Sequence, residues 1–455
     1  MSEGDRDPPS VQGGLAESGP GAPEGAAIAP RGSRAARAGR AIRGLAVDVT
    51  PLRRSRDFRL LWSAGLVSQT GRQFTVTAVY IQVFRLTNSA TALGLLGLVE
   101  LIPLTVASIA AGSVVDAVDR RKLMLVTQVC YAVTSVLLLT SALAHLSVGW
   151  VYLFDGMAAA VGGVAQPTTT AMTPRLVGTE LLPSALALNQ VMWNTTMIVG
   201  PALGGVVVAT VDLPWAYGID AITYGATIAA ALLMRPMPPE HDGARPAGIS
   251  AIREGFAYLK GRRVLQSTFT IDLVAMIFGM PRILFPVLAV EQFHASPDHA
   301  PVVVGLLLSA LAAGALLGAV SAGWVGRIRH QGRAVIIAVS IWGAGIVAFG
   351  LSGSHLWLAI AFLAVAGGAD VISAVFRGAI LQGSVPDVLR GRLSAIHILV
   401  VTGGPRVGDF EAGMVAGVFT PFISVISGGL ACLASVAVIT ALVPQFWRYH
   451  AGDPT

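Results

Sequence analysis

Long apolar runs, separated by short polar segments, dominate the chain from Leu60 almost to its C-terminus. Each run has roughly 20 residues, the length that an α-helix needs to cross a hydrocarbon core of ~30 Å. The apolar positions are continuous and do not alternate with polar ones, which argues against a transmembrane β-barrel. The pattern predicts twelve membrane-spanning helices, at residues 59–84, 91–115, 123–144, 148–170, 184–209, 214–234, 264–290, 301–325, 333–353, 356–380, 393–417 and 419–443.

The composition supports the same class of protein. Of 455 residues, 54% are hydrophobic and 12% are charged, and the mean hydropathy is +0.69. Such values are typical of an all-α integral membrane protein, which has the lipid bilayer as a partner. The net charge of +6 would also suit nucleic acid, but the basic residues gather at predicted helix ends, so we expect no such partner. Cys130 and Cys432 lie inside apolar runs, where we expect packing rather than a disulfide or a metal site.

The basic residues also predict an orientation. All but four of the 31 Lys and Arg residues lie in the two tails, in the even-numbered connections or beside them. The four exceptions are Arg72, Arg85, Arg282 and Arg406. Because basic residues collect on the cytoplasmic side of a membrane, we expect both termini in the cytoplasm.

The chain divides into five predicted segments. Residues 1–50 are rich in Gly, Ala, Pro, Ser and Arg without periodicity, so we expect a disordered cytoplasmic tail. Residues 51–234 and 264–445 are expected to form two six-helix bundles, and 446–455 a second cytoplasmic tail. The linker, 235–263, contains ISAIREGFAYLK, in which Ile252, Phe256 and Leu259 recur at helical spacing. This spacing predicts an amphipathic helix on the inner membrane surface.

Two short matches indicate that the two bundles are repeats of each other. Gly112 and Gly323 each open a charged connection and stand 211 residues apart. Pro174 and Pro386 lie in another pair of similar connections and stand 212 residues apart. Two independent loops with almost the same offset favour a duplicated architecture, which is common among secondary transporters.

Twelve spans in two repeats, with a long middle connection and a charged connection after the second span, resemble the major facilitator superfamily. In members of that superfamily, the connection after the second span has the sequence pattern Gly, three residues, Asp-Arg, one residue, Gly and then pairs of basic residues. In GSVVDAVDRRK the residues that fit are Gly112, Asp116, Arg120, Arg121 and Lys122. The residues that depart from the pattern are Ala117 and Asp119. The resemblance implies that Asp116 is a gating aspartate that meets the end of the eleventh span, whereas the three basic residues are expected to stay in water.

Other sequence segments indicate which branch of the superfamily the chain resembles. GPALGG resembles the core of the superfamily's antiporter motif through Gly200, Pro201, Gly204 and Gly205, although the upstream glycines are replaced. FDG, TPRLVGTE, LPWAYGIDA, REGFAYL, RILFPVLA and the Gly-Asp pair at 408–409 are similar to segments of bacterial enterobactin exporters and macrolide-type exporters. This resemblance implies a proton-coupled exporter in the bacterial cell membrane that works by alternating access, as a monomer and without a cofactor. A catecholate siderophore is the favoured small-molecule substrate, and multidrug or macrolide efflux is the alternative.

Ionisable and polar side chains within the spans are the candidates for chemistry, because an unpaired charge in hydrocarbon is costly. The candidates for proton coupling are Glu100, Asp370 and Asp409. The candidates that face a substrate cavity are Gln69, Arg72, Gln73, Asp155, Arg282 and Arg406. Structural pairs are the competing interpretation: Arg406 and Asp409 can face each other on one helix, and Arg282 could pair with Asp272 instead of attracting an anion.

Two other function classes find little support. A channel would show rings of like residues in a symmetric filter segment, and we see none. The sequence holds no G-x-x-x-x-G-K-[ST], HExxH or CxxC motif, and nothing in the order of its serines and histidines suggests a triad. We therefore expect neither an enzyme nor a metal protein.

Overall fold

The computed structural model describes residues 48–239, 249–321, 328–385 and 387–450. The prediction for the tail before Asp48 lies outside the described residues. From Asp48 onward the chain forms one compact unit of packed helices. Because both halves belong to this unit, the division into two six-helix domains stays a prediction.

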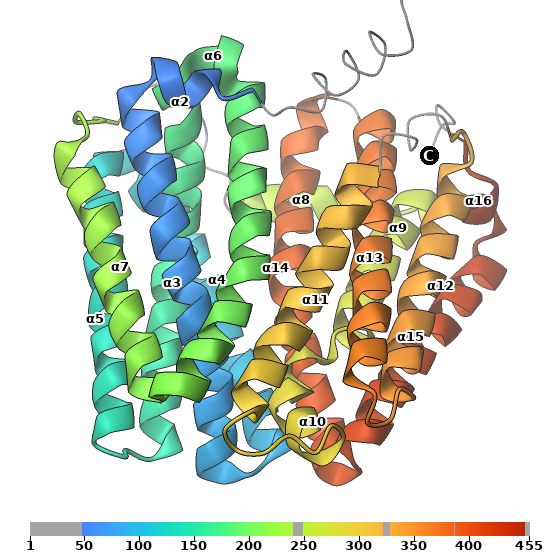
Figure 1. The fold of residues 1–455 in the computed structure, drawn as a ribbon. Helices are drawn as coiled ribbons and strands as arrows, with labels where there is room; N and C mark the ends of the chain where they lie inside the picture. The colour runs from blue at the N-terminus through green and yellow to red at the C-terminus, as the bar shows by residue number, and fades with distance from the viewer. Residues whose placement is uncertain (1–47, 240–248, 322–327, 386, 451–455) are drawn as a thin grey trace, which may run out of the picture. The chain divides into compact units, whose positions relative to one another are not determined.

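Helices of the first half begin at polar caps. Ser55 accepts a hydrogen bond from the Phe58 N–H at 3.2 Å, and Ser89 and Asp119 cap the next two long helices in the same way. Such caps satisfy N–H groups that have no partner within the helix. The elements are α2 (Thr50–Arg54), α3 (Arg56–Thr87), α4 (Ala90–Ala117), α5 (Arg120–Leu143), α6 (Val148–Val211) and α7 (Leu213–Leu233) (Figure 1).

The longest element, α6, consists of two helices joined at a kink. It has 64 residues, and at a rise of about 1.5 Å per residue it is far longer than one crossing requires. At Gly178 the φ angle is +73°, a conformation that glycine adopts without steric cost. This interruption lies in the predicted connection between the spans 148–170 and 184–209.

The second half contains a broken span where one continuous helix was expected, at 264–290. Here α9 ends at Phe278, and η1 and α10 follow. Pro281 has no N–H to continue the helix, and the Gly279 carbonyl instead accepts a hydrogen bond from the Trp342 indole at 3.0 Å. The elements are α8 (Ile249–Leu259), α9 (Arg263–Phe278), η1 (Pro281–Leu284), α10 (Phe285–Glu291), α11 (Ala300–Ser321), α12 (Gln331–Gly350), α13 (Leu356–Ser384), α14 (Asp387–Val418), α15 (Pro421–Leu442) and α16 (Pro444–Arg448).

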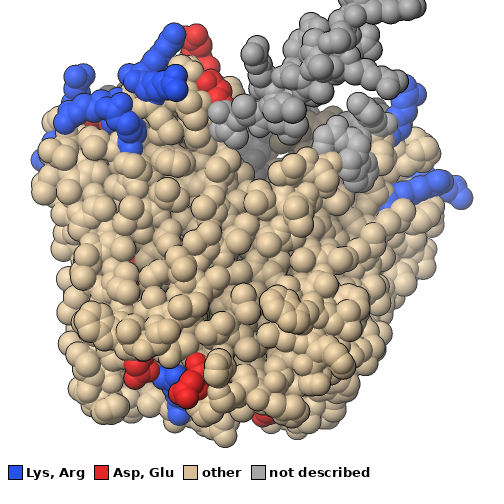
Figure 2. Space-filling model, in the orientation of Figure 1, with Lys and Arg blue, Asp and Glu red and all other residues tan. Residues whose placement is uncertain are grey.

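Nine helices within the described ranges are long and apolar enough to cross a membrane, counting α6 once and α9 to α10 as one. The more polar α3 and α14 are not among them. The predicted fold class is therefore confirmed, whereas the count of twelve spans stays a prediction. On the face shown in Figure 2, charged side chains lie near the two ends of the bundle and the broad band between them is uncharged.

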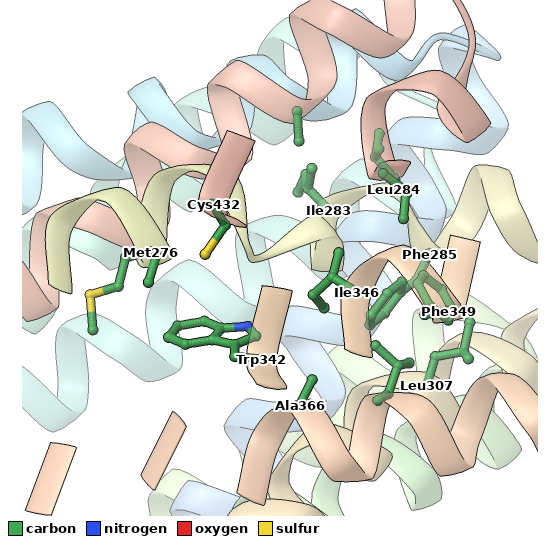
Figure 3. Close-up of a cluster of buried hydrophobic side chains, with 14 of the residues drawn as sticks. Met276, Ile283, Leu284, Phe285, Leu307, Trp342, Ile346, Phe349, Ala366 and Cys432 are labelled. Atoms are coloured by element: carbon green, nitrogen blue, oxygen red, sulfur yellow. The ribbon is translucent and has the colours of Figure 1, made fainter. Parts of the chain in front are cut away.

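The core of the second half is built from large apolar side chains. Trp342, Phe349 and Phe285 are almost completely buried, and Phe285 and Phe349 meet edge to face with ring centroids 5.9 Å apart (Figure 3). Cys432 is fully buried in the same cluster. Its thiol thus packs like a small apolar group, as its place in an apolar run predicts.

The two halves meet most closely near one end of the bundle. We call the end with α2 the upper end and the end with α10 the lower end, as drawn in Figure 1. Near the lower end α4 and α14 approach so closely that a methyl group on Gly94 would lie 2.8 Å from the Gly413 Cα. A methyl group on Gly97 would meet the Arg406 carbonyl oxygen, and one on Gly417 would meet the Thr91 side chain. We name Gly94, Gly97, Gly413 and Gly417 the glycine seam. Only residues without a side chain permit this approach.

Two short helices flank the long ones near the upper end. In α8, the predicted amphipathic helix, Leu259 is buried and Phe256 is 53% exposed, while the side chain of Ile252 is outside the description. α8 contacts α14 and α9. Within the predicted tail 446–455, Phe446 on α16 and Tyr449 are buried against the bundle, so residues up to 450 are packed.

Candidate functional site

Two ion pairs lie at mid-span where the halves face each other. Arg406 on α14 places its Nε 3.1 Å from Glu100 Oε2 on α4, so this pair joins the two halves. Arg282, in η1, binds both carboxylate oxygens of Asp409 on α14, with a shortest N–O distance of 2.7 Å. We name these four residues the central belt.

The pairing differs from the helical pair that the sequence suggested. Arg406 and Asp409 are neighbours on α14, but Arg406 pairs with Glu100 and Asp409 with Arg282. Arg282 also does not pair with Asp272. The reason is tertiary: α14 packs between α4 and the η1 segment, and each of these supplies a group of opposite charge.

Part of the central belt is accessible although it lies half-way along the long helices. The side chains of Glu100, Arg406 and Arg282 are 20%, 18% and 28% exposed, whereas Asp409 is 3% exposed. A charged group at this depth is stable only beside an opposite charge or water. The accessible sides of these groups are therefore where a polar solute could replace water.

Asp155 on α6 belongs to the same electrostatic environment. It interacts electrostatically with Glu100, Arg72 and Arg406. Its Oδ2 atom is buried and has no hydrogen-bond partner among the described residues. An unsatisfied carboxylate oxygen is rare in a protein interior, and this one belongs to a group that interacts with Glu100 and Arg406 of the central belt.

A polar cluster inside the first half surrounds Arg72. The Arg72 guanidinium donates a hydrogen bond to the Tyr131 hydroxyl and lies 4.8 Å from the centre of that ring. Tyr131 in turn stacks on Tyr224 at a centroid distance of 5.3 Å. Buried Asp220 accepts hydrogen bonds from Thr75 at 2.6 Å and from Ser135 at 2.7 Å. Arg72 is therefore held by aromatic rings from α5 and α7, not directed to lipid.

The two glutamines beside Arg72 have different environments. Gln73 is 7% exposed, and its amide donates to the Met197 sulfur at 3.5 Å. Its side chain packs against Gly200 of the GPALGG motif. Gln69 is half-buried. Of the two, Gln69 is the more accessible to a solute.

A second charged cluster, inside the second half, was not expected from the sequence. Arg377 on α13 lies 2.7 Å from Asp272 on α9 and 3.8 Å from Asp370. His397 on α14 lies 3.9 Å from Asp272. The sequence pattern groups Arg377 with the basic flank of the span 356–380, but its side chain is only 3% exposed. The spacing of seven between Asp370 and Arg377 places both on one helix face and could have indicated the pair.

The charged connection after α4 binds helix ends rather than water alone. Arg121 donates to the carbonyls of Ala231 and Leu232 at 2.6 and 2.7 Å, at the C-terminal end of α7. Arg120 donates to the Ala171 carbonyl at 3.2 Å. Cations near the carbonyl end of a helix are stabilised by its dipole. Arg120 and Arg121 are half-buried and bind these carbonyls in addition to facing water, while Lys122 is exposed.

Other residues of the two sequence motifs have distinct positions. Asp119, which replaces the usual glycine, accepts hydrogen bonds from the N–H groups of Arg121 at 2.9 Å and Met237 at 3.2 Å. The surroundings of Gly112 and of the Asp116 side chain lie outside the part of the chain that the structure describes, so the gating contact of Asp116 stays a prediction. In the antiporter motif, Gly204 packs on Phe74 of α3, and Pro201 and Gly205 face α11 across the boundary between the halves.

Comparisons with known proteins agree with this architecture. Residues 46–449 match the family model described as transmembrane secretion effector. The chain belongs to the transmembrane secretion effector family. This secretion effector is 24% identical over 402 residues to the enterobactin exporter EntS of Citrobacter koseri, with 87% of the chain and 94% of the relative covered. It is also 24% identical over 403 residues to the enterobactin exporter EntS of Shigella boydii serotype 18, with the same coverage.

Solved structures show the same fold for this secretion effector. A mutant of the nucleoside transporter NupG has a TM-score of 0.70 and 12% identity, covering 86% of this chain and all 100% of its own. A D-xylose-proton symporter has a TM-score of 0.65 and 13% identity, with 87% and 99% covered. The family match and the curated relatives confirm the predicted resemblance to the major facilitator superfamily, and the solved structures show its fold. The chain is a multi-pass membrane transporter of this family.

Proposed function

We propose that this transporter is a proton-coupled exporter of a small molecule and that it works by alternating access. The central belt carries the proposal. It lies where the halves face each other, it is partly accessible, and the Glu100–Arg406 pair can exist only while α4 and α14 are close. Such a pair favours one state of the transporter, and its rupture is part of the change to the other.

The proposed substrate is an anionic, polyhydroxylated compound of the catecholate siderophore class. The relatives named as enterobactin exporters support this choice. Arg282 and Arg406 are the two cations of the central belt and both are partly accessible, and guanidinium groups bind paired oxygens in two hydrogen bonds. Asp155, which interacts electrostatically with Glu100 and Arg406, and the half-buried Gln69 of α3 are proposed as further polar contacts. Multidrug or macrolide efflux is the alternative within the same family.

We further propose that the upper end is cytoplasmic and that one chain is the working unit in a bacterial cell membrane. Arg120, Arg121, Arg175 and Lys122 all lie beside connections at the upper end. This follows the rule that basic residues stay on the cytoplasmic side. A cysteine placed at Lys122 should therefore react with a membrane-impermeant thiol reagent only after the cells are opened.

Two experiments test the function. In proteoliposomes, a pH gradient should drive accumulation of an iron-free catecholate siderophore, and an uncoupler should abolish it. Lack of any gradient-dependent movement would contradict the coupling. In cells grown under iron limitation, deletion of the gene should lower secreted catecholate in the medium and raise it in the cytosol. Unchanged secretion together with raised drug sensitivity would favour the efflux alternative.

A further inference from the structure

The charged cluster inside the second half is isolated from the central belt and has an uneven charge. It consists of Asp272 on α9, Asp370 and Arg377 on α13, and His397 on α14. We name it the C-half cluster. Asp272 and Arg377 are 2% and 3% exposed, so both are buried, whereas Asp370 is 27% and His397 42% exposed.

The Arg377 guanidinium is the only described cationic group beside two carboxylates of this cluster, those of Asp272 and Asp370. Arg377 Nη2 lies 2.7 Å from Asp272 Oδ1 but 3.8 Å from Asp370 Oδ1. Its other contact is a hydrogen bond to the Ser373 hydroxyl at 2.7 Å. The buried Nε of Arg377 and the buried Oδ1 atoms of both Asp272 and Asp370 have no hydrogen-bond partner among the described residues, so Arg377 and Asp272 are joined by the short ion pair alone. With His397 neutral, the cluster therefore holds one negative charge in excess inside a low-dielectric region.

No described side chain on the neighbouring helices compensates this charge. α11, which packs on α13, contains no ionisable residue. On α12, also packed on α13, the sole ionisable residue is Arg333, whose guanidinium lies 5.4 Å from the Trp447 ring centre at the upper end. Among the described side chains of α9 and α14, Asp272 and His397 reach the cluster. A proton or another small cation is what would neutralise it.

Asp370 is the carboxylate in this cluster that can exchange a proton. The close ion pair with Arg377 favours the anion of Asp272 against the cost of its burial, and the side chain is sealed from the solvent with which a proton would exchange. Asp370 is held more loosely by Arg377 and reaches accessible space half-way along α13. In contrast, Glu100 and Asp409 each have an arginine of their own, and neither needs a proton for neutrality.

We propose that Asp370 is the proton-carrying residue of the transporter and that Arg377, Asp272 and His397 position and tune it. The proton binds to a carboxylate oxygen of Asp370 while Arg377 stays paired with Asp272. On release, the Asp370 anion competes with Asp272 for Arg377, and this competition couples α13 to α9. The proton site is thereby separate from the proposed substrate groups of the central belt. This inference rests on the proposed proton coupling.

The test separates coupling from transport. In proteoliposomes, Asp370→Asn should lose pH-gradient-driven accumulation at least about tenfold, while exchange of labelled for unlabelled substrate at equal pH stays within about twofold of wild type. Asp272→Asn leaves one carboxylate for one arginine, so it should also exchange substrate without responding to the gradient. Glu411→Gln, which removes another carboxylate from a spanning helix of the same half, should stay coupled.

A binding experiment gives a readout that does not depend on transport. When substrate is added to purified protein in weakly buffered detergent solution, wild type and Glu411→Gln should change the pH of the medium by a similar amount. Asp370→Asn should bind substrate without this change. The change would persist in Asp370→Asn if another group carried the proton.

The outcomes distinguish the two proposals. If wild type does not respond to a pH gradient, or responds to a sodium gradient instead, the proposed coupling fails and the assignment of Asp370 fails with it. If wild type is coupled and Asp370→Asn remains coupled, only the assignment fails. Loss of coupling in Glu411→Gln but not in Asp370→Asn would move the proton site to α14.

Discussion

The glycine seam allows a direct test of how the lower end is held closed. The change is Gly413→Ala on α14. The added methyl group would lie 2.6 Å from the backbone nitrogen of Gly94 and 2.8 Å from the Ala90 carbonyl oxygen on α4. Nonbonded carbon contacts are most favourable at about 3.5–4.0 Å, so the two backbones would have to separate by roughly 1 Å. Neither contact involves a flexible side chain that could move away.

The expected magnitude follows from the cost of overpacking. Extra methyl groups in tightly packed interiors cost about 1–3 kcal/mol, and this cost applies only to the state in which the lower end is closed. Since about 1.4 kcal/mol corresponds to a factor of ten, the closed state should lose about 5- to 150-fold in population relative to an open one.

The assay is a distance measurement by pulsed electron paramagnetic resonance. Spin labels at Trp215→Cys and Phe419→Cys report on the two halves, because both positions are exposed, at 60% and 64%, and lie at the lower end. Cys130 is replaced by Ala, and Cys432 is fully buried and stays unlabelled. Gly413→Ala should shift the distribution to longer distances.

The matched control is Gly218→Ala on α7, where an added methyl group meets nothing within 4 Å. It makes the same chemical change in a helix but should leave the distances as in wild type. If Gly413→Ala and Gly218→Ala give the same distribution as wild type, the seam does not determine closure of the lower end.

Three further predictions concern charges. Glu100→Gln and Arg406→Gln should each lower the Tm and the free energy of unfolding. The double variant should lose about 0.5–3 kcal/mol less unfolding free energy than the two single losses added together, and strictly additive losses would contradict the pair. Arg377→Met should destabilise by about 3–5 kcal/mol in thermal unfolding because it leaves the Asp272 charge buried, and adding Asp272→Asn should restore part of this. At Asp212, in the connection between α6 and α7, burial raises the pKa, but hydrogen bonds from the Leu213 N–H and Arg85 outweigh it and hold the pKa below its usual value. A lowered pKa stabilises the fold at pH values above the unfolded-state pKa of about 3.9, and for so exposed a pair this contribution to the free energy of unfolding is under about 1 kcal/mol. The Tm of wild type should therefore exceed that of Asp212→Asn above this pH, and the difference should vanish as the pH falls below it.

The helices themselves follow closely from the hydrophobic pattern. The predicted span 214–234 corresponds to α7 at Leu213–Leu233, and 91–115 lies within α4. Length and hydropathy are local properties, so a single sequence contains them. The break at Gly279 is different: the apolar run continues through it, and the hydrogen bond from Trp342 that accommodates it comes from a distant helix.

The candidate site was predictable in its members but not in its pairs. Charges within apolar runs are rare enough to identify Glu100, Arg282 and Arg406 directly. Their partners depend on which helices pack together and in which register, and the spacing of three between Arg406 and Asp409 suggested a contact that tertiary packing replaces. Arg377 was hidden because it lies near the end of its apolar run, where basic residues usually meet headgroups.

The seam has a consequence for how closure responds to the environment. Most of its contacts join backbone to backbone, and the others reach the Thr91 side chain and the Cβ of Asp409. None is made by an atom that gains or loses a proton, so pH and salt leave them unchanged. The ion pair of Glu100 and Arg406 lies beside it and does respond to charge. Closure of the lower end thus has two components: a fixed geometric one sets where the halves meet, and an adjustable electrostatic one sets how long they stay together. A bound anion that draws Arg406 away from Glu100 would shorten that lifetime without altering the place of contact.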